Sequence, residues 1–285
     1  MTVDLSVLAT GLDHPEAVAW SRQGWLAAGG EAGQIYAVDP SSGTVRKVAD
    51  TGGFVLGMAF DAADRLYVCD MGRHAVLRVD PRSGTVDDIT TGFAETEVRV
   101  PNMATFTADG TLFFSDSGDW GANNSLIFAR TTQGAVRVAS DEARGFANGI
   151  ALDPDGRHLY VAESSVPCVS RFPLLDGGRL GAREVVVETP RTVPDGIAFA
   201  ADGRLVICCY RPDALYVWDG STVEPLVSDW SGLTLSAPTG VAFFGDRLER
   251  LVAANLHGQT LVEVHCALTG ATLNFPDLTL EEADC

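Results

Sequence analysis

Four side chains with oxygen donors stand at the head of apolar, strand-like segments of this sequence. They are Glu16 in "HPEAVAW", Asn102 in "VPNMATF", Asn148 in "FANGIAL" and Asp195 in "VPDGIAF". Carboxylate and amide oxygens are hard ligands that suit Ca²⁺ best, and then Mg²⁺ or Mn²⁺. Zn²⁺ is possible but usually takes His or Cys ligands. If the fold brings the four side chains together, they can form an oxygen-rich site for one divalent cation.

A simpler interpretation exists for two of these residues. Asn148 and Asp195 each precede a glycine, and Asn-Gly and Asp-Gly are common turn formers. That alternative does not explain Glu16 or Asn102, which no glycine follows. We therefore expect the four residues to share one role.

The four residues occupy one column of a repeat that runs along the chain. Each repeat has a short turn, an apolar strand, a turn of the Asp-Gly kind, a second apolar strand and further strand-like segments, as in "FANGIALDPDGRHLYVAES". The repeat occurs six times, with its column spaced by 40 to 47 residues. In chain order the column holds Glu16, Leu56, Asn102, Asn148, Asp195 and Thr239.

A four-stranded repeat of this length predicts an all-β fold, a six-bladed β-propeller with four-stranded blades, as a single domain over residues 1–285. No segment shows sustained helical periodicity. The first strand of each blade lines the central channel of a propeller, so the column should form a ring around the axis.

The two ends of the chain carry separate expectations. The N-terminal "DLSVLATGL" resembles the last strand of a blade and precedes the first full repeat. We expect it to complete the last blade, whose inner strands begin near Pro238, which closes the ring and hides two sheet edges. The chain after Gly270 is expected to pack outside the ring or to fray.

A second column lies at the ends of the second strands. Most of its members are acidic or polar, and we expect mainly structural hydrogen bonds from them, with some side chains facing the channel mouth. This column holds Gly29, Asp70, Asp116, Glu163, Cys209 and Asn255.

Charge and composition exclude several classes of partner. The net charge is −18, from 38 acidic and 20 basic residues, and Lys47 is the single lysine. Such a surface repels nucleic acid and anionic lipid, so neither nucleic acid nor a membrane is an expected partner. No apolar run approaches the length of a membrane span. A small-molecule substrate and a monomer or weak homodimer are expected.

Cysteine usage and the N-terminus favour the cytoplasm. The six cysteines form no C-x-x-C pair and no zinc-finger spacing, and most lie in apolar strands, which indicates buried free thiols in a reducing compartment. The N-terminal segment has no basic leader followed by an apolar stretch, so no secretory signal is expected.

The motifs resemble those of the SMP-30/gluconolactonase/LRE-like family of six-bladed propellers. "HPEAVAW", "VPNMATFTADGTLFFSDSG", "FANGIALDPDGRHLYVAES", "VPDGIAFAADGRL" and "PTGVAFFGDRLERLVAANLHG" are similar to its blade motifs in the same order, over nearly the whole chain. The resemblance implies lactone hydrolysis, of sugar or other lactones, or hydrolysis of some phosphotriesters. Related strictosidine-synthase-like propellers share the scaffold, and some of them lack the metal ligands.

The same resemblance implies site residues. It places Glu16, Asn102, Asn148 and Asp195 around one divalent cation, with Asn102 as a weaker ligand or a substrate contact. Met103 departs from the family, which has Asp after this Asn. The implied function is a divalent-metal-dependent lactonase or esterase, in which the cation polarises a carbonyl and Asp195 first, or Glu16 second, orients or deprotonates the water.

Other residues are candidates for contact with the substrate. Val100 stands where sugar lactonases often carry Arg, and Arg99 lies beside it, so we expect a more apolar pocket and a substrate other than a sugar. Trp120, in the polar loop 115–125, is expected either to stack on a ligand or to cap the blade. His257 is interpreted as a loop histidine or as an acid or base at the mouth. The substrate-binding candidates are Arg99, Asn102, Met103, Trp120 and His257.

Two other functions stay open at this point. The ring could serve a non-hydrolytic biosynthetic step, or the protein could be a non-enzymatic binding propeller with a structural Ca²⁺. No G-x-S-x-G motif or Ser-His-Asp order is present, which disfavours covalent acyl transfer.

Overall fold

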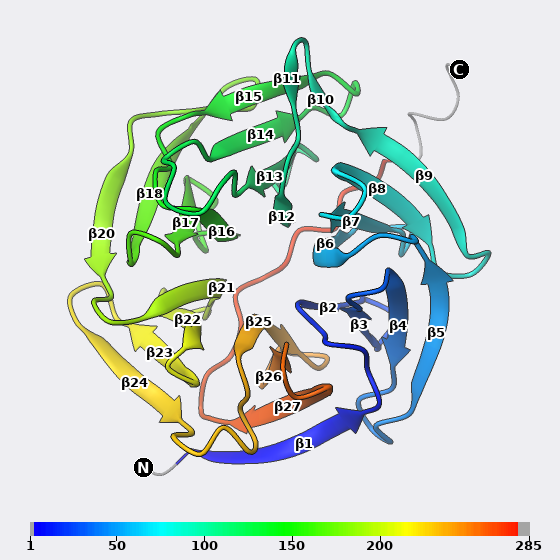
Figure 1. The fold of residues 1–285 in the computed structure, drawn as a ribbon, viewed down its shortest axis with the longest axis vertical. Coiled ribbons are helices and arrows are strands. Elements are labelled where there is room, and N and C mark those ends of the chain that lie inside the picture. Colours follow the sequence, from blue (N-terminus) through cyan, green and yellow to red (C-terminus); the bar gives the residue numbers. More distant parts are fainter. Residues whose placement is uncertain (1–2, 279–285) are drawn as a thin grey trace.

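Six antiparallel sheets stand side by side around a central axis in the computed structural model, which describes residues 3–278 (Figure 1). No helix occurs among the described residues, so none is long and apolar enough to cross a membrane. The prediction of an all-β, six-bladed propeller is confirmed.

Each of the first five blades is made from consecutive strands. Blade 1 contains β2 (Val18–Trp20), β3 (Leu26–Gly29), β4 (Gln34–Val38) and β5 (Val45–Asp50). Blade 2 contains β6 (Val55–Phe60), β7 (Leu66–Asp70), β8 (Ala75–Asp80) and β9 (Thr85–Thr90). The hairpin of β10 (Gly92–Phe93) and β11 (Thr96–Glu97) follows. Blade 3 contains β12 (Pro101–Phe106), β13 (Leu112–Asp116), β14 (Leu126–Arg130) and β15 (Val136–Ser140).

The remaining blades keep this order with two additions. Blade 4 contains β16 (Ala147–Leu152), β17 (His158–Glu163), β18 (Cys168–Leu175), β20 (Glu184–Glu188) and the short β19 (Arg179–Leu180). Blade 5 contains β21 (Val193–Phe199), β22 (Leu205–Arg211), β23 (Ala214–Trp218) and β24 (Val223–Ser228). Blade 6 contains β25 (Pro238–Phe244), β26 (Arg250–Asn255), β27 (Thr260–His265) and β1 (Asp4–Thr10).

The N-terminal strand closes the ring as predicted. β1 pairs antiparallel with β27, from Asp4 opposite His265 to Thr10 opposite Thr260. The first segment of the chain thus completes the last blade, and the outer edge of β27 is not left open.

The expectation for the C-terminal segment is wrong as far as the structure describes it. Residues 270–278 run across the centre of the ring (red in Figure 1). The N–H of Ala271 donates to the carbonyl of Phe199 (2.9 Å) in blade 5, and the side-chain amide of Asn274 donates to the carbonyl of Phe106 (2.8 Å) in blade 3. The segment therefore links blades on different sides of the ring. Residues 279–285 lie outside the described part.

The reason for this path is apolar burial. Leu278 is buried among side chains of blades 2 and 3, and Phe275 packs against the core between blades 1 and 2. Burying such side chains is favourable by about 1.5–3 kcal/mol each, so the segment is held against the ring. The rest of the core follows the same plan, because each of its clusters lies between two neighbouring blades.

Candidate metal centre

The column residues stand where the inner strands are irregular. In blades 2 to 6 the pairing of the inner strand with its neighbour shifts register at the column position, which marks a β-bulge. A bulge turns a side chain out of the regular alternation of a strand, and bulges are common beside functional sites. Glu16 lies just ahead of β2, after His14, whose backbone is left-handed at φ 42°. We call the six column residues the ring: Glu16, Leu56, Asn102, Asn148, Asp195 and Thr239.

The glycines after Asn148 and Asp195 do not form turns, so the turn-former alternative is wrong. Both lie inside strands, β16 and β21. A Cβ on Gly149 would lie 2.3 Å from the carbonyl oxygen of Asp195, and one on Gly196 would lie 2.4 Å from that of Thr239. These glycines therefore allow neighbouring inner strands to approach backbone to backbone. The ring residues on those strands are brought closer together as a result.

Two carboxyl groups of the ring are buried close to one another. Burial raises the pKa of Glu16 to about 7, against a hydrogen bond from Thr239, and the charge of Glu31 adds to the rise. Burial also raises the pKa of Asp195 well above its usual range, the charge of Glu16 raises it further, and a hydrogen bond from Asn148 opposes both. No basic side chain among the described residues lowers either pKa. The pair therefore lacks a positive partner.

Two acceptor atoms of the ring are buried without a hydrogen-bond partner. They are Oε2 of Glu16 and Oδ1 of Asn148. A buried acceptor left unsatisfied costs about 1–3 kcal/mol. A cation bound by these oxygens and by Asp195 would satisfy both acceptors and neutralise the carboxylate pair. The residues present thus fit a hard divalent cation.

Two serines that the sequence analysis missed hold the ring amides. Nδ2 of Asn148 donates to Oγ of Ser164 (3.2 Å), which donates to the carbonyl of Pro194 (2.6 Å), the residue ahead of Asp195. Nδ2 of Asn102 likewise donates to Oγ of Ser117 (3.1 Å). The Ser117 hydroxyl donates to the carbonyl ahead of Asn148 (2.7 Å). A sequence signal existed, because a serine directly follows the acidic end of the second strand only in the two blades whose ring residue is Asn.

Beyond the ring the channel is apolar. A cavity of about 170 Å³ lies along the inner strands and is closed by residues 271–275. Met103 lines this cavity, which places it on the far side of the ring from the loops that lead into the inner strands. The cavity walls include the residues two positions after all six ring members, which are Val18, Met58, Ala104, Ile150, Ile197 and Val241.

Arg99 and Trp120 belong to the rim of the mouth. The guanidinium of Arg99 donates to Asp119 (3.0 Å) and to the carbonyl of Asn124 (2.8 Å), so it holds the loop between β13 and β14. Trp120 packs on Phe146 with ring centroids 5.1 Å apart, yet it stays 61% exposed. Phe146 lies two residues ahead of Asn148, so Trp120 flanks the approach to the ring.

His257 is an exposed residue in the loop between β26 and β27. Its ring nitrogens lie 3.4 Å from the hydroxyl of Tyr210 and 3.5 Å from the guanidinium of Arg211. The guanidinium of Arg211 also stacks over the ring of Tyr210, 4.7 Å from its centroid. The three residues form one polar cluster on the rim, and these contacts include no ring residue.

The second column makes structural hydrogen bonds. Asp116 accepts from the backbone N–H of Val100 (2.8 Å), and Glu163 accepts from that of Gly145 (2.9 Å). Glu163 also pairs with Arg183 (2.7 Å). These side chains hold the backbone that leads into the inner strands, so they help to position the ring residues.

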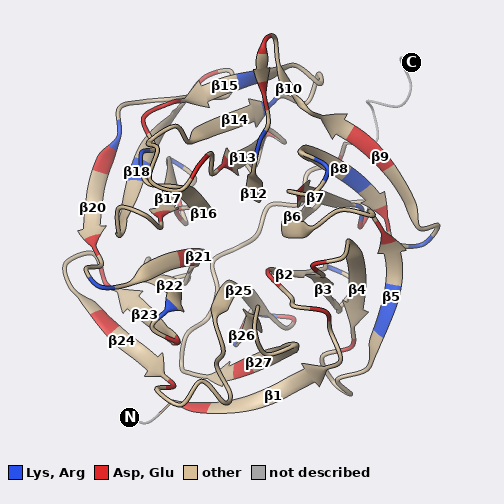
Figure 2. Ribbon diagram, viewed as in Figure 1, with Lys and Arg blue, Asp and Glu red and all other residues tan. Residues whose placement is uncertain are grey.

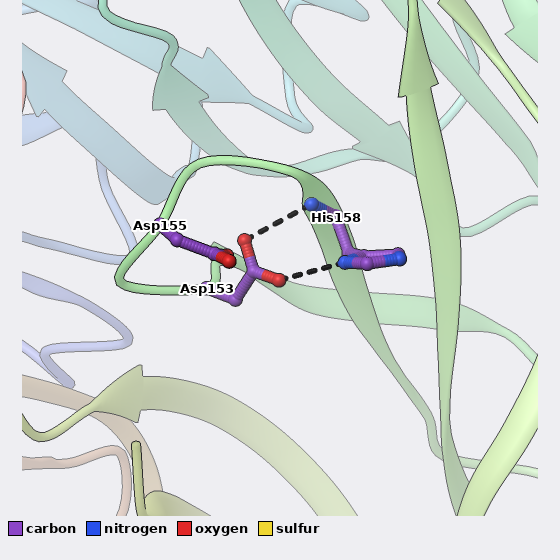
Figure 3. Close-up of side chains that lie close together, drawn as sticks. All are labelled: Asp153, Asp155 and His158. Atoms are coloured by element: carbon purple, nitrogen blue, oxygen red, sulfur yellow. Dashed lines mark hydrogen bonds and ion pairs between the residues drawn. The ribbon is translucent and has the colours of Figure 1, made fainter. Parts of the chain in front are cut away.

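A second group of possible cation ligands lies away from the channel. Asp153, Asp155 and His158 offer ligand atoms within 4.8 Å of one another at the turn between β16 and β17 (Figure 3). The oxygens of Asp153 already accept from the backbone of Arg157 (2.7 Å) and from Nδ1 of His158 (2.8 Å). These hydrogen bonds close the turn, so the three side chains have a structural role without a cation. The ring differs, because two of its acceptors have no partner.

Charge is spread around all the blades rather than gathered at one face (Figure 2). Acidic and basic segments are interspersed around the propeller, and the whole sequence has 38 acidic and 20 basic residues. The charge of the surface therefore does not by itself mark the site.

Comparison with known proteins assigns a family. A profile described as "SMP-30/Gluconolactonase/LRE-like region" matches residues 8–255. The chain is 24% identical over 211 residues to the STRICTOSIDINE SYNTHASE-LIKE 6 protein of Arabidopsis thaliana, covering 68% of this chain and 55% of that protein. It is 24% identical over 222 residues to a gluconolactonase of Zymomonas mobilis, covering 70% and 60%. The chain thus spans 55–60% of the length of these curated relatives.

Solved structures share the fold. A gluconolactonase from Xanthomonas campestris superposes with a TM-score of 0.80 at 22% identity, covering 93% of this chain and 90% of that one. A calcium-binding protein, regucalcin, from Agrobacterium tumefaciens superposes with a TM-score of 0.79 at 16% identity, covering 97% and 98%.

Proposed function

Because the chain belongs to the SMP-30/Gluconolactonase/LRE-like family, we propose that it is a divalent-metal-dependent hydrolase that opens a lactone or an ester at the ring. The observation that carries the proposal is the pair of buried, unpartnered acceptors on Glu16 and Asn148 beside the carboxyl group of Asp195. Single buried acceptors without partners occur elsewhere, such as Oε1 of Gln34 and Oδ2 of Asp70, whereas the ring brings two of them beside a buried carboxyl group that no basic side chain balances.

The proposed ligands are Glu16, Asn148 and Asp195, with Asn102 as a weaker ligand or a substrate contact. All of them offer oxygen, which favours Ca²⁺ over Mg²⁺ and Mn²⁺, and disfavours Zn²⁺. The fold shared with a protein described as calcium-binding supports the same choice.

When bound, a divalent cation supplies a Lewis acid for the carbonyl and its oxyanion. The chain supplies the rest. Asp195 accepts a hydrogen bond from the attacking water and orients it, because a carboxylate beside a dication is a weak base but a good acceptor. Glu16 is the second carboxylate able to do so, and Asn102 offers its amide to the substrate.

The substrate we propose is a lactone with apolar substituents rather than a sugar lactone. Leu56 brings an apolar side chain into the ring, and Arg99 is engaged with Asp119 and Asn124. A guanidinium held in this way is not free to bind sugar hydroxyl groups. Trp120 and Phe146 offer aromatic surface at the rim.

The test is hydrolysis of a panel of sugar lactones, alkyl lactones and aryl esters by protein stripped with EDTA and then reloaded with Ca²⁺, Mg²⁺ or Mn²⁺. We expect the stripped protein to be inactive and Ca²⁺ to restore turnover, with alkyl lactones preferred. Full activity and unchanged thermal stability of protein shown to be metal-free would contradict the proposal. Cation binding at the ring without hydrolysis would point to the non-hydrolytic or the binding function instead.

The setting proposed for this activity is the cytoplasm. Five cysteines among the described residues are free thiols, which suits a reducing compartment. The partner we propose is the small-molecule substrate.

A further inference from the structure

We propose that Ser117 and Ser164 are positioning residues that set which end of each ring amide faces the channel axis, and that Ser164 thereby controls cation affinity. This inference rests on the proposed function, because it concerns the same cation site.

A serine hydroxyl group has a single proton to donate. Ser164 Oγ donates that proton to the carbonyl of Pro194 (2.6 Å), which can only accept. Its lone pairs then have to accept from the ring amide. Only the Nδ2 end of Asn148 can donate, so this end faces Ser164 (3.2 Å) and Oδ1 is directed away from it.

Such control matters because an amide has two ends of nearly the same shape. The last torsion of Asn is broad and roughly two-fold, so packing alone does not choose between them. With the amide reversed, an NH₂ group would meet the cation in place of an oxygen. Oδ1 of Asn148 is buried without a partner, so no hydrogen bond of this atom holds the orientation. The amide also donates to the carboxyl group of Asp195, but that carboxylate is a proposed ligand of the same cation, so Ser164 is the partner that stays with the amide when the cation binds.

The pattern across the blades supports this role. A serine follows the second strand only where the ring residue is Asn, as in Asn102 with Ser117 and Asn148 with Ser164. A carboxylate has the same atom at both ends and needs no such control. At the matching position, directly after the second-column residue, the other four blades have Gly30 with Glu16, Met71 with Leu56, Tyr210 with Asp195 and Leu256 with Thr239.

The two serines should differ in how strongly they affect cation affinity. Oδ1 of Asn148 is the buried acceptor without a partner, whereas no such atom is found on Asn102. The loss of Ser164 should therefore weaken cation binding more than the loss of Ser117.

The test is calorimetric titration of EDTA-stripped protein with Ca²⁺, with Mn²⁺ binding followed by electron paramagnetic resonance. We expect Ser164→Ala to weaken binding by about 10–100-fold, the usual range for residues that orient a ligand. Ser164→Thr keeps the hydroxyl and should restore most of the affinity. In an Asn148→Asp background both ends are oxygen, so Ser164→Ala should then cause no loss.

The controls separate positioning from a general effect on the fold. Ser21 is also fully buried and hydrogen-bonded, to Asp64 on the opposite side of the blades, so Ser21→Ala should lower the melting temperature without changing cation affinity. If Ser164→Ala does not fold, the same test can be made with Ser117→Ala, measured in the wild-type and in the Asn102→Asp background. The expected loss of cation affinity is then smaller.

The outcomes are distinct. The inference is overturned if Ser164→Ala binds the cation as tightly as wild type. It is also overturned if Ser164→Ala loses as much affinity in the Asn148→Asp background as in the wild-type background. Either result leaves the proposed function in place. If the wild-type protein binds no cation at all, the proposed function fails and the inference fails with it.

Discussion

The two halves of the central channel are built from the same inner strands but differ in almost every physical respect. The half at the mouth holds the ring, where Asn148 and Asp195 are polar, buried and set on bulges. The other half is an apolar cavity closed by the C-terminal segment, where Ile150 and Ile197 sit in regular pairing. Two residues along a strand thus separate a polar position on a bulge from regularly paired apolar packing.

The two halves of the channel are therefore expected to serve different purposes, the ring binding and catalysis and the far half the stability of the fold. Ordinary interiors satisfy their polar groups, and departures from that rule concentrate at functional sites. The ring departs from it at Glu16 and Asn148, whereas the far half adds apolar burial through Phe275 and Leu278. Changes in the ring should therefore affect binding and turnover, and changes in the far half should affect folding.

The largest effect should come from Asp195→Asn. Turnover should fall by about 10²–10⁴-fold, the range expected for a group that handles the reacting water. The cation-free protein should be at least as stable as wild type, because the substitution removes a buried carboxylate that no basic group balances. Steady-state hydrolysis and thermal melts in EDTA measure the two properties. A variant that melts at a lower temperature than wild type yet keeps its specific activity would contradict this assignment of Asp195.

The next largest effect should come from Leu278→Ala, in the far half. Removing a buried leucine side chain should cost about 2–3 kcal/mol in the free energy of unfolding, seen as a lower midpoint in denaturant. Affinity for Ca²⁺ should not change. Leu273→Ala, at a residue of the same segment that is 42% exposed, is the matched control and should change little. Equal losses from both variants would contradict the burial of Leu278.

A moderate effect should appear in the pH dependence of the cation-free protein. A carboxyl group whose folded pKa is raised stabilises the fold below its ordinary pKa, and this stabilisation is lost as the pH rises through the folded pKa. For Glu16 that window runs from 4.5 to about 7. Melting temperatures in EDTA should therefore fall as the pH rises from about 5 to about 7. Glu16→Gln, which removes the titrating group, should make this fall smaller. Saturating Ca²⁺ should remove it, and a pH-independent melting temperature in EDTA would count against a buried carboxylate pair.

The smallest effect should come from Trp120→Ala at the rim. Trp120 is 61% exposed, so stability should change by less than about 0.5 kcal/mol. If it flanks the route of the substrate, KM should rise while kcat and Ca²⁺ affinity hold. Trp230, which is 98% exposed in the loop between β24 and β25, is the control, and Trp230→Ala should leave KM unchanged.

Much of the architecture could be predicted from the sequence. The repeat places one polar position per blade in register, and the start of the chain reads as a last strand, which β1 confirms by pairing with β27. This works because apolar alternation and turn residues are local properties of the chain. The ring residues could be named for the same reason.

The rest depends on contacts that no local pattern contains. Gly149 and Gly196 read as turn residues, but their meaning comes from the neighbouring strand that each one touches. Ser164 donates its hydroxyl proton to the carbonyl of Pro194 in the next blade. The C-terminal segment has no strand pattern of its own, and its path is set by where Leu278 can be buried.

The central claim is that one divalent cation binds at the ring. Anomalous diffraction from crystals soaked in Mn²⁺ tests it most directly, because the signal locates the ion without regard to activity. We predict one strong peak within coordination distance of Glu16, Asn148 and Asp195. A peak at the turn of Asp153 and His158, with none at the ring, would contradict it.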